Sequence, residues 1–156
     1  MSHQALLTEE NPIPIPKHLQ FRRSWRWKHP IEEFFKIHTE GKHSLNVCCG
    51  QSKIGTCRVD VDPNSTATHL ADIRALPFKD NTFDVTISDP PWKLGFFQRF
   101  RPFYECVRVT KLGGLIIYNA TWVPFSNQCV EIERYSRCDM QFRLASVISV
   151  FKKVLE

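Results

Sequence analysis

The sequence predicts a single α/β domain with an open, mostly parallel β-sheet, a C-terminal antiparallel strand and shortened helices. Its 156 residues are about one domain's length, and its composition, 42% hydrophobic and 24% charged, is that of a globular protein. Short apolar runs of strand type recur along the chain, separated by short helices or loops. Several of these runs end in Gly, Asp or Pro, which suits the strand ends at which α/β sheets bind ligands.

The first half of the chain is predicted to contain one helix and four strands. Residues 30–39 are expected to form the helix, because Pro30 suits a first helical turn and Gly41 suits the end of a helix. Strands are expected where apolar residues form short runs, at 44–49, 56–61, 67–71 and 83–88. The connection between the first two strands is too short for a further helix, so a loop is expected there.

The second half is predicted to add one helix and three strands. Residues 96–110 are the most helix-like stretch, and Pro102 should start or kink a helix there. The nearly continuous apolar run 113–120 is typical of a strand buried on both faces. Residues 129–137 and 144–154 alternate between apolar and polar side chains, which predicts a terminal antiparallel pair.

Composition also excludes several classes of protein. No apolar run approaches the roughly 20 residues needed to cross a bilayer, and the N-terminus does not resemble a secretion signal. The six cysteines include no C-x-x-C pair, so they favour reduced, mostly buried thiols over a zinc site. We therefore expect a cytoplasmic protein without a metal site and without a membrane partner.

The net charge of +5 is unevenly distributed. Residues 17–29 hold no acid and interleave basic with aromatic side chains, and residues 93–101 form a second basic and aromatic run. Basic side chains bind phosphates and aromatic rings stack on bases, so both runs suit nucleic acid, although either alone equally suits a solvated face. The candidate nucleic-acid contacts are Arg22, Arg23, Trp25, Arg26, Lys93, Arg99 and Arg101.

Chemically informative residues follow four predicted strands at their carboxyl ends. Gly50 follows the first strand and would let a ligand approach the backbone closely. Asp60 ends the second strand and could accept hydrogen bonds from ribose hydroxyls, and Asp72, after the third, could accept one from an amino group. The fourth strand ends in Asp-Pro-Pro-Trp, residues 89–92. This order predicts a nucleoside pocket beside residues 89–92.

Four segments resemble the class I S-adenosylmethionine-dependent methyltransferases, whose fold is Rossmann-like. They are LNVCCGQS (45–52), VDVDP (59–63), ADIRALPFKDNTFDVTIS (71–88) and FYECVRVTKLGGLIIY (103–118). The resemblance implies S-adenosylmethionine as cofactor, an N-terminal extension over 1–43 and a methyltransferase domain over 44–156. The cofactor-binding residues that it implies are Asn46, Cys48, Gly50, Asp60, Asp72, Ile73 and Asp89. Asn46 stands where the family usually has an acid, and Cys48 replaces a glycine.

Within that family, an Asp-Pro-Pro-Trp sequence after the fourth strand resembles the amino-methyltransferases. The lone pair of a base amine is delocalised into the ring, so the nitrogen is a poor nucleophile. Asp89 and the Pro90 carbonyl could each accept one of its N–H bonds and so direct the lone pair at the methyl group. Trp92 could stack on a base that has left its helix. These three residues are the predicted catalytic residues.

Several substrate classes remain open. The most favoured is an exocyclic amine in structured RNA, with ribosomal RNA foremost, because the chain has too few residues outside the core for a DNA target-recognition domain. The target could be cytosine N4, as in compact archaeal ribosomal RNA methyltransferases, or adenine N6. The alternatives are a DNA amino-methyltransferase, a protein glutamine methyltransferase and a non-catalytic S-adenosylmethionine-binding subunit.

Overall fold

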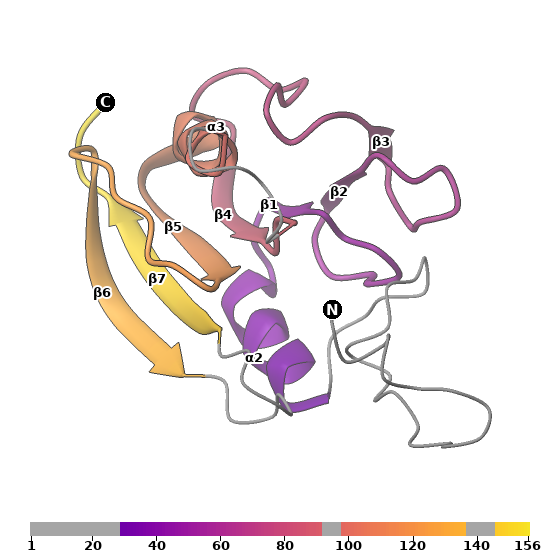
Figure 1. The fold of residues 1–156 in the computed structure, drawn as a ribbon, viewed down its shortest axis with the longest axis horizontal. Helices are drawn as coiled ribbons and strands as arrows, with labels where there is room; N and C mark the ends of the chain where they lie inside the picture. The colour runs from indigo at the N-terminus through magenta and orange to yellow at the C-terminus, as the bar shows by residue number, and fades with distance from the viewer. Residues whose placement is uncertain (1–28, 92–97, 137–145) are drawn as a thin grey trace, which may run out of the picture.

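The computed structural model describes residues 29–91, 98–136 and 146–156. Within them a seven-stranded sheet is accompanied by two helices (Figure 1). In chain order the elements are α2 (His29–Thr39), β1 (Ser44–Val47), β2 (Cys57–Asp60), β3 (His69–Leu70), β4 (Phe83–Ser88), α3 (Arg101–Val109), β5 (Thr110–Ala120), β6 (Cys129–Ser136) and β7 (Val147–Lys153).

The sheet confirms the predicted fold class. Its strand order is β3-β2-β1-β4-β5-β7-β6, and the first five strands in this order are parallel. Strand β7 runs antiparallel to both β5 and β6. Because β1 to β5 are parallel, their carboxyl ends meet at one edge of the sheet, where ligands bind in open α/β folds.

The two helices cover opposite faces of the sheet, and alternation along β5 shows this. Ile116 belongs to the core cluster that contains Phe103 of α3, whereas its neighbour Ile117 belongs to the cluster that contains Phe35 of α2. Successive side chains of a strand point to opposite faces, so each helix closes one face. The boundary between residues 43 and 44 stays a prediction, but α2 shares a core with the sheet through Phe35, which is 1% exposed.

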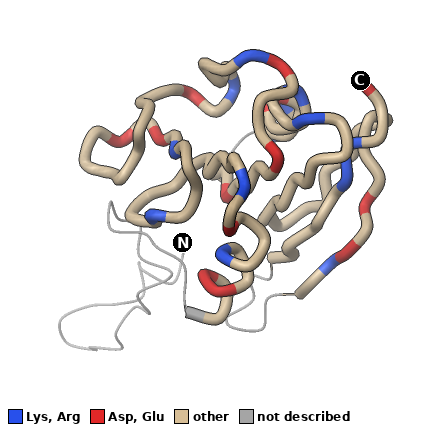
Figure 2. The backbone as a smooth tube through the Cα atoms, turned by 180° about the vertical axis from the view of Figure 1, so that it is seen from behind, with Lys and Arg blue, Asp and Glu red and all other residues tan. Residues whose placement is uncertain are grey.

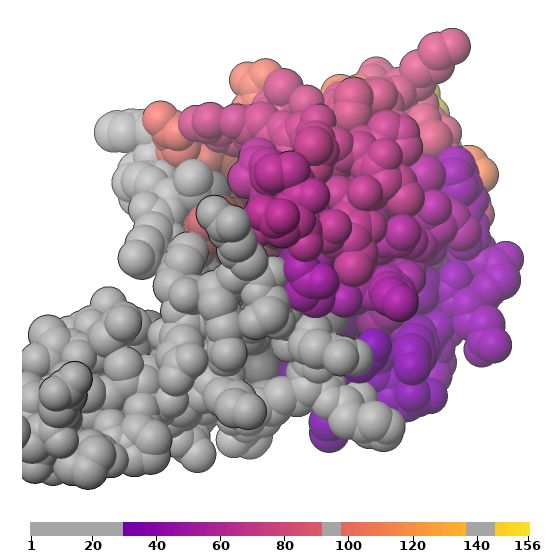
Figure 3. Space-filling model, turned by 90° about the vertical axis from the view of Figure 1, so that its right-hand side faces the viewer, coloured from indigo at the N-terminus to yellow at the C-terminus, as the bar shows by residue number. Residues whose placement is uncertain are grey.

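The connections from β1 to β4 contain no helix in the described chain, as the sequence predicted for the first of them. Viewed from the side of β3, this loop-rich segment forms the surface that faces the viewer (Figure 3). The Arg58 side chain holds two of these loops together, because its guanidinium donates hydrogen bonds to the carbonyls of Gly55 and Thr66. Side-chain bonds to loop backbone therefore satisfy groups that a helix would otherwise have paired.

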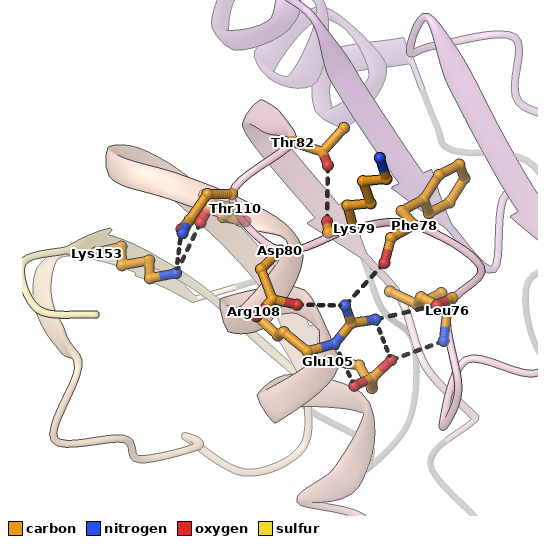
Figure 4. Close-up of polar contacts among 10 residues, drawn as sticks. Leu76, Phe78, Lys79, Asp80, Thr82, Glu105, Arg108, Thr110 and Lys153 are labelled. Atoms are coloured by element: carbon orange, nitrogen blue, oxygen red, sulfur yellow. Dashed lines mark hydrogen bonds and ion pairs between the residues drawn. The ribbon is translucent and has the colours of Figure 1, made fainter.

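A partly buried ion pair on α3 holds the segment that precedes β4 (Figure 4). Glu105, only 8% exposed, accepts hydrogen bonds from the Leu76 N–H at 2.7 Å and from the Arg108 guanidinium at 2.8 Å. Arg108 in turn donates to the carbonyls of Leu76 and Phe78 and to the Asp80 carboxylate. One helix thus pins a loop that begins at the predicted cofactor residues Asp72 and Ile73.

The junction between α3 and β5 differs from the prediction. The helix begins at Arg101, beside Pro102 in its first turn, and the strand begins directly at Thr110 rather than at residue 113. Phe83 pairs with Thr110 but Val85 pairs with Leu115, so residues 111–114 bulge out of the ladder. A Cβ on Gly114 would lie 2.8 Å from the Asp84 carbonyl, which explains why the bulge needs glycine there.

Charge is mixed over the described segments, where basic and acidic positions are interspersed along the chain (Figure 2). These segments hold equal numbers of basic and acidic residues, so the net charge of +5 comes from residues 1–28, 92–97 and 137–145. No described helix is long and apolar enough to cross a membrane.

Candidate functional site

The carboxyl edge of the parallel strands brings the predicted cofactor residues together. Cys48 and Gly50 follow β1, Asp60 ends β2, Asp72 follows β3 and Asp89 follows β4. Strand β1 lies between β2 and β4, so the turn after β1 is flanked by Asp60 on one side and Asp89 on the other. This is the arrangement that a nucleoside bound across the edge requires.

Asp60 joins the turns that follow β1 and β2. Its carboxylate oxygens accept hydrogen bonds from the Gly50 N–H at 2.9 Å and from the Asp62 N–H at 3.0 Å. The side chain is only half-buried, so it can also face a ligand. A carboxylate has about four lone-pair sites, so two backbone bonds leave it the capacity to accept from ribose hydroxyls.

Cys48 occupies a left-handed backbone conformation, with φ 60°, at a position where the family it resembles has glycine. Such a conformation is uncommon for a residue with a Cβ. The Cys48 side chain packs against the hydrophobic core. Burial, and then the carboxylates of Asp60 and Asp89, raise the pKa of the Cys48 thiol well above its usual value. Both carboxylates therefore act on the same turn, and the thiol stays protonated and inert.

Asn46 is buried on β1, just before the turn that carries Gly50. Its side chain is 2% exposed, and its Nδ2 group donates to the Ser52 hydroxyl at 3.3 Å and to the Ile54 carbonyl at 3.2 Å. These bonds close the loop that replaces a helix after β1. Asn46 thus shapes the turn that carries Gly50, and its contact with a cofactor stays a prediction.

Asp72 is already paired in the structure. Arg74 forms a bond of 2.6 Å with its carboxylate, and both side chains are nearly half exposed. Hydrogen bonds from the Arg74 side chain and backbone lower the pKa of Asp72 to about 2. An adenine amine would therefore have to share this carboxylate with Arg74. Ile73, 7% exposed, contributes its side chain to the core.

Asp89 is anchored on two sides at the end of β4. Its N–H donates to the Val47 carbonyl of β1 at 3.3 Å, and its Oδ1 atom accepts a hydrogen bond from Asn119 Nδ2 at 2.9 Å. The adjacent Pro90 is buried, whereas Asp89 is half-buried. Trp92, the third predicted catalytic residue, lies outside the described residues. The described part of the Asp-Pro-Pro-Trp sequence is thus held against β1 and β5.

Two of the candidate nucleic-acid contacts can be placed. The Arg99 guanidinium lies over the rings of Phe100 and Trp122, at 5.1 and 5.4 Å from their centroids. Arg101 is exposed and donates to the Arg74 carbonyl at 3.1 Å. The remaining candidates lie outside the described residues: Arg22, Arg23, Trp25, Arg26 and Lys93.

Sequence reasoning missed the partner of Asp89. Asn119 is fully buried near the end of β5, and Ser146 donates to its Oδ1 atom at 3.0 Å. The available signal was a single amide in the apolar run 113–120, because a buried polar group needs a partner. Its partner could not be named without the register of β4 against β5.

One other feature lies apart from this edge. A pocket of about 460 Å³ opens at the opposite edge, where β1 begins, and is lined by residues 41–44 with Thr39, Gly55 and Thr56. Among the described residues, no three His, Cys, Asp or Glu side chains gather as a metal site would require.

Comparison with known proteins identifies the fold. No protein-family model matches the chain, and no curated protein matches its sequence. The N-methyltransferase NodS from Bradyrhizobium japonicum WM9, solved with S-adenosyl-L-homocysteine, is 12% identical with a TM-score of 0.62, over 80% of this chain and 84% of NodS. A TehB-like S-adenosylmethionine-dependent methyltransferase from Corynebacterium glutamicum is 14% identical with a TM-score of 0.58, over 78% and 86%.

The same architecture serves more than one reaction. The [4+2]-cyclase SpnF is also similar, with a TM-score of 0.63 and 11% identity over 81% of each chain. At these identities the likeness concerns the fold, and the reaction has to be argued from the site. The strand order, the single antiparallel strand β7 and these neighbours show that the chain has the Rossmann-like fold of the class I S-adenosylmethionine-dependent methyltransferases.

Proposed function

We propose that this protein transfers a methyl group from S-adenosylmethionine to an exocyclic amino group of a base, cytosine N4 or adenine N6, in structured RNA, with ribosomal RNA foremost. One observation carries the proposal. The Asp89 carboxylate stands at the end of β4, beside the β1 turn that Asp60 braces from the other side. The proposed acceptor for the amine and the proposed acceptor for the ribose thus flank the same turn.

The residues of this edge fit the proposed cofactor. Asp60 offers a half-buried carboxylate for ribose hydroxyls, and the Gly50 backbone that it holds can approach a ligand closely. Asp72, held by Arg74, is the proposed acceptor for the adenine amine. S-adenosylmethionine, when bound, would supply a methyl group on a positively charged sulfur.

Asp89 and Pro90 are the proposed amine-holding pair. The carboxylate and the Pro90 carbonyl would each accept one N–H bond of the target amine, which directs the nitrogen lone pair at the methyl group. Transfer would form the nitrogen–carbon bond as the sulfur–carbon bond breaks, which would leave a neutral thioether, and the proton that the nitrogen loses would pass to solvent. Anchoring of Asp89 by Val47 and Asn119 supports this role, because positioning lowers the barrier only if the acceptor itself is held.

The proposal of RNA as substrate is supported by the distribution of charge. The net positive charge lies in segments that include the basic and aromatic stretch 17–29, which suits a phosphate backbone with unpaired bases. A protein glutamine methyltransferase has no need of such a stretch. A non-catalytic cofactor-binding subunit would have no use for the anchored Asp89.

The test is methyl transfer with a matched pair of variants. The protein is incubated with methyl-labelled S-adenosylmethionine and, separately, ribosomal RNA, transfer RNA and DNA, and mass spectrometry of nucleosides identifies the modified base. Asp89→Ala should bind cofactor yet transfer methyl about 100-fold or more slowly, the usual cost of a lost transition-state contact. Asp84→Ala, which removes a carboxylate paired with Lys111 at the other end of β4, should keep the wild-type rate. Equal rates for Asp89→Ala and wild type would refute the proposed role.

A further inference from the structure

We propose that Asn119 is a positioning residue for the reaction, which orients the Asp89 carboxylate toward the target amine; this rests on the proposed function. Asn119 itself is fully buried. It acts through the hydrogen bond from its Nδ2 group to Asp89 Oδ1, at 2.9 Å. The role joins the end of β5 to a site that the sequence placed on β1 to β4 alone.

The register of the sheet places Asn119 beside Asp89. Ile87 of β4 pairs with Ile117 of β5, which pairs with Val150 of β7, and these three side chains are at most 1% exposed. Side chains two residues apart share a face, so Asp89 and Asn119 form the next row toward the carboxyl edge. The two polar groups therefore meet on an apolar floor.

Two hydrogen bonds indicate the orientation of the Asn119 amide. A carboxylate only accepts hydrogen bonds, so the group that faces Asp89 has to be the NH₂ donor. On the other side the Ser146 hydroxyl donates to Oδ1 at 3.0 Å, which suits the opposite end of the same amide. The chain Ser146–Asn119–Asp89 thus has one consistent direction of donation.

The burial of Asn119 indicates that its amide serves a role other than packing. Asn119 is 0% exposed in a strand whose preceding residues 115–118 are all apolar or aromatic, and an aliphatic residue would fill its place without a cost of desolvation. A hydrogen bond to Asp89 Oδ1 restricts rotation of the carboxylate plane. That restriction favours one direction in which Asp89 meets the amine.

The test is a double-mutant cycle on the single-turnover rate at saturating RNA and cofactor. Asn119→Val should slow methyl transfer about 10- to 100-fold, as small misplacements of reacting groups do, while the dissociation constant for S-adenosylhomocysteine stays within about twofold of wild type. In an Asp89→Ala background the same substitution should cause no further loss, because the residue through which it acts is gone. Ser146→Ala should give a smaller loss, since the amide keeps its bond to Asp89.

Thr86→Val is the matched control. It removes a buried hydrogen bond between the same two strands, from Thr86 to Thr110 at 2.8 Å, and should lower thermal stability without slowing the reaction. If Asn119→Val fails to fold, the single variants Ser146→Ala and Asp89→Ala and their double mutant provide an equivalent cycle.

The outcomes separate this inference from the proposed function. Wild-type rates in both Asn119→Val and Ser146→Ala would overturn the positioning role and leave the methyltransferase intact. The positioning role would also be overturned if the loss of rate in each double mutant equalled the product of the losses in its two single variants, because the two residues would then act independently. A wild-type protein that binds S-adenosylhomocysteine but modifies none of the nucleic acids would overturn the proposed function, and the positioning role with it.

Discussion

Replacement of Asp60 by Ala tests the cofactor site most directly. The carboxylate accepts the Gly50 N–H at 2.9 Å and the Asp62 N–H at 3.0 Å, and it is the proposed acceptor for ribose hydroxyls. Hydrogen bonds to a charged group contribute about 1.5–3 kcal/mol each, and the half-buried side chain argues for the lower end. Loss of both backbone bonds should therefore lower the free energy of unfolding by about 3 kcal/mol.

The effect on binding is a separate quantity with its own measurement. Isothermal titration with S-adenosylhomocysteine should show a loss of about 1–3 kcal/mol in Asp60→Ala, which is roughly a 5- to 150-fold weaker affinity. Thermal unfolding without ligand measures the structural part. In both measurements Asp60→Asn should lie between wild type and Asp60→Ala, because its amide oxygen can replace one carboxylate oxygen as an acceptor and its NH₂ group cannot.

Asp62→Ala is the matched control for both measurements. Asp62 accepts hydrogen bonds from Asn64 within the same turn, and no cofactor role is proposed for it. It should change stability modestly and leave the affinity unaltered. The reasoning is refuted if folded Asp60→Ala binds S-adenosylhomocysteine as tightly as wild type, which would make Asp60 only a link between two turns.

Three further predictions concern other parts of the chain. Burial alone would raise the pKa of Glu105, but hydrogen bonds from Arg108 and from the Leu76 N–H outweigh it and lower the pKa. The stabilisation that the Glu105 carboxylate provides is therefore fully present above the unfolded pKa of about 4.3 and is lost as pH falls through the lower folded pKa. Glu105→Ala should lower the free energy of unfolding in urea at neutral pH by about 1–3 kcal/mol, the usual cost of leaving a hydrogen-bonded group without its partner. The difference from wild type should shrink on acidification, and a constant difference would contradict the linkage. Replacement of Arg22, Arg23 and Arg26 by Glu should abolish RNA binding but not cofactor binding, and wild-type affinity should fall steeply with salt in filter-binding assays; a flat salt dependence would indicate another substrate class. Trp92→Ala should weaken binding of an RNA with an unpaired target base by about 1–3 kcal/mol, and an unchanged affinity would exclude stacking.

Local sequence patterns predicted most of the fold, because hydrophobic alternation and turn residues act over a few neighbours. Residues 83–88 were predicted as a strand and β4 spans the same range, and the helix predicted at 30–39 is α2 with one residue added. The start of β5 was missed, because the bulge at 111–114 depends on contact between Gly114 and the Asp84 carbonyl of a neighbouring strand. Such a contact has no local signature.

By itself, the sequence determined which residue types end each parallel strand, and so placed Gly50, Asp60, Asp72 and Asp89 along one edge. This was possible because parallel strands share a direction, so order along the chain implies position at the edge. Only the tertiary structure decided what those residues touch. Asn119 meets Asp89 across 30 residues and Ser146 across 27, through the register of three strands. Register depends on packing of both faces of the whole sheet, and a shift of one residue would turn Asn119 to the opposite face.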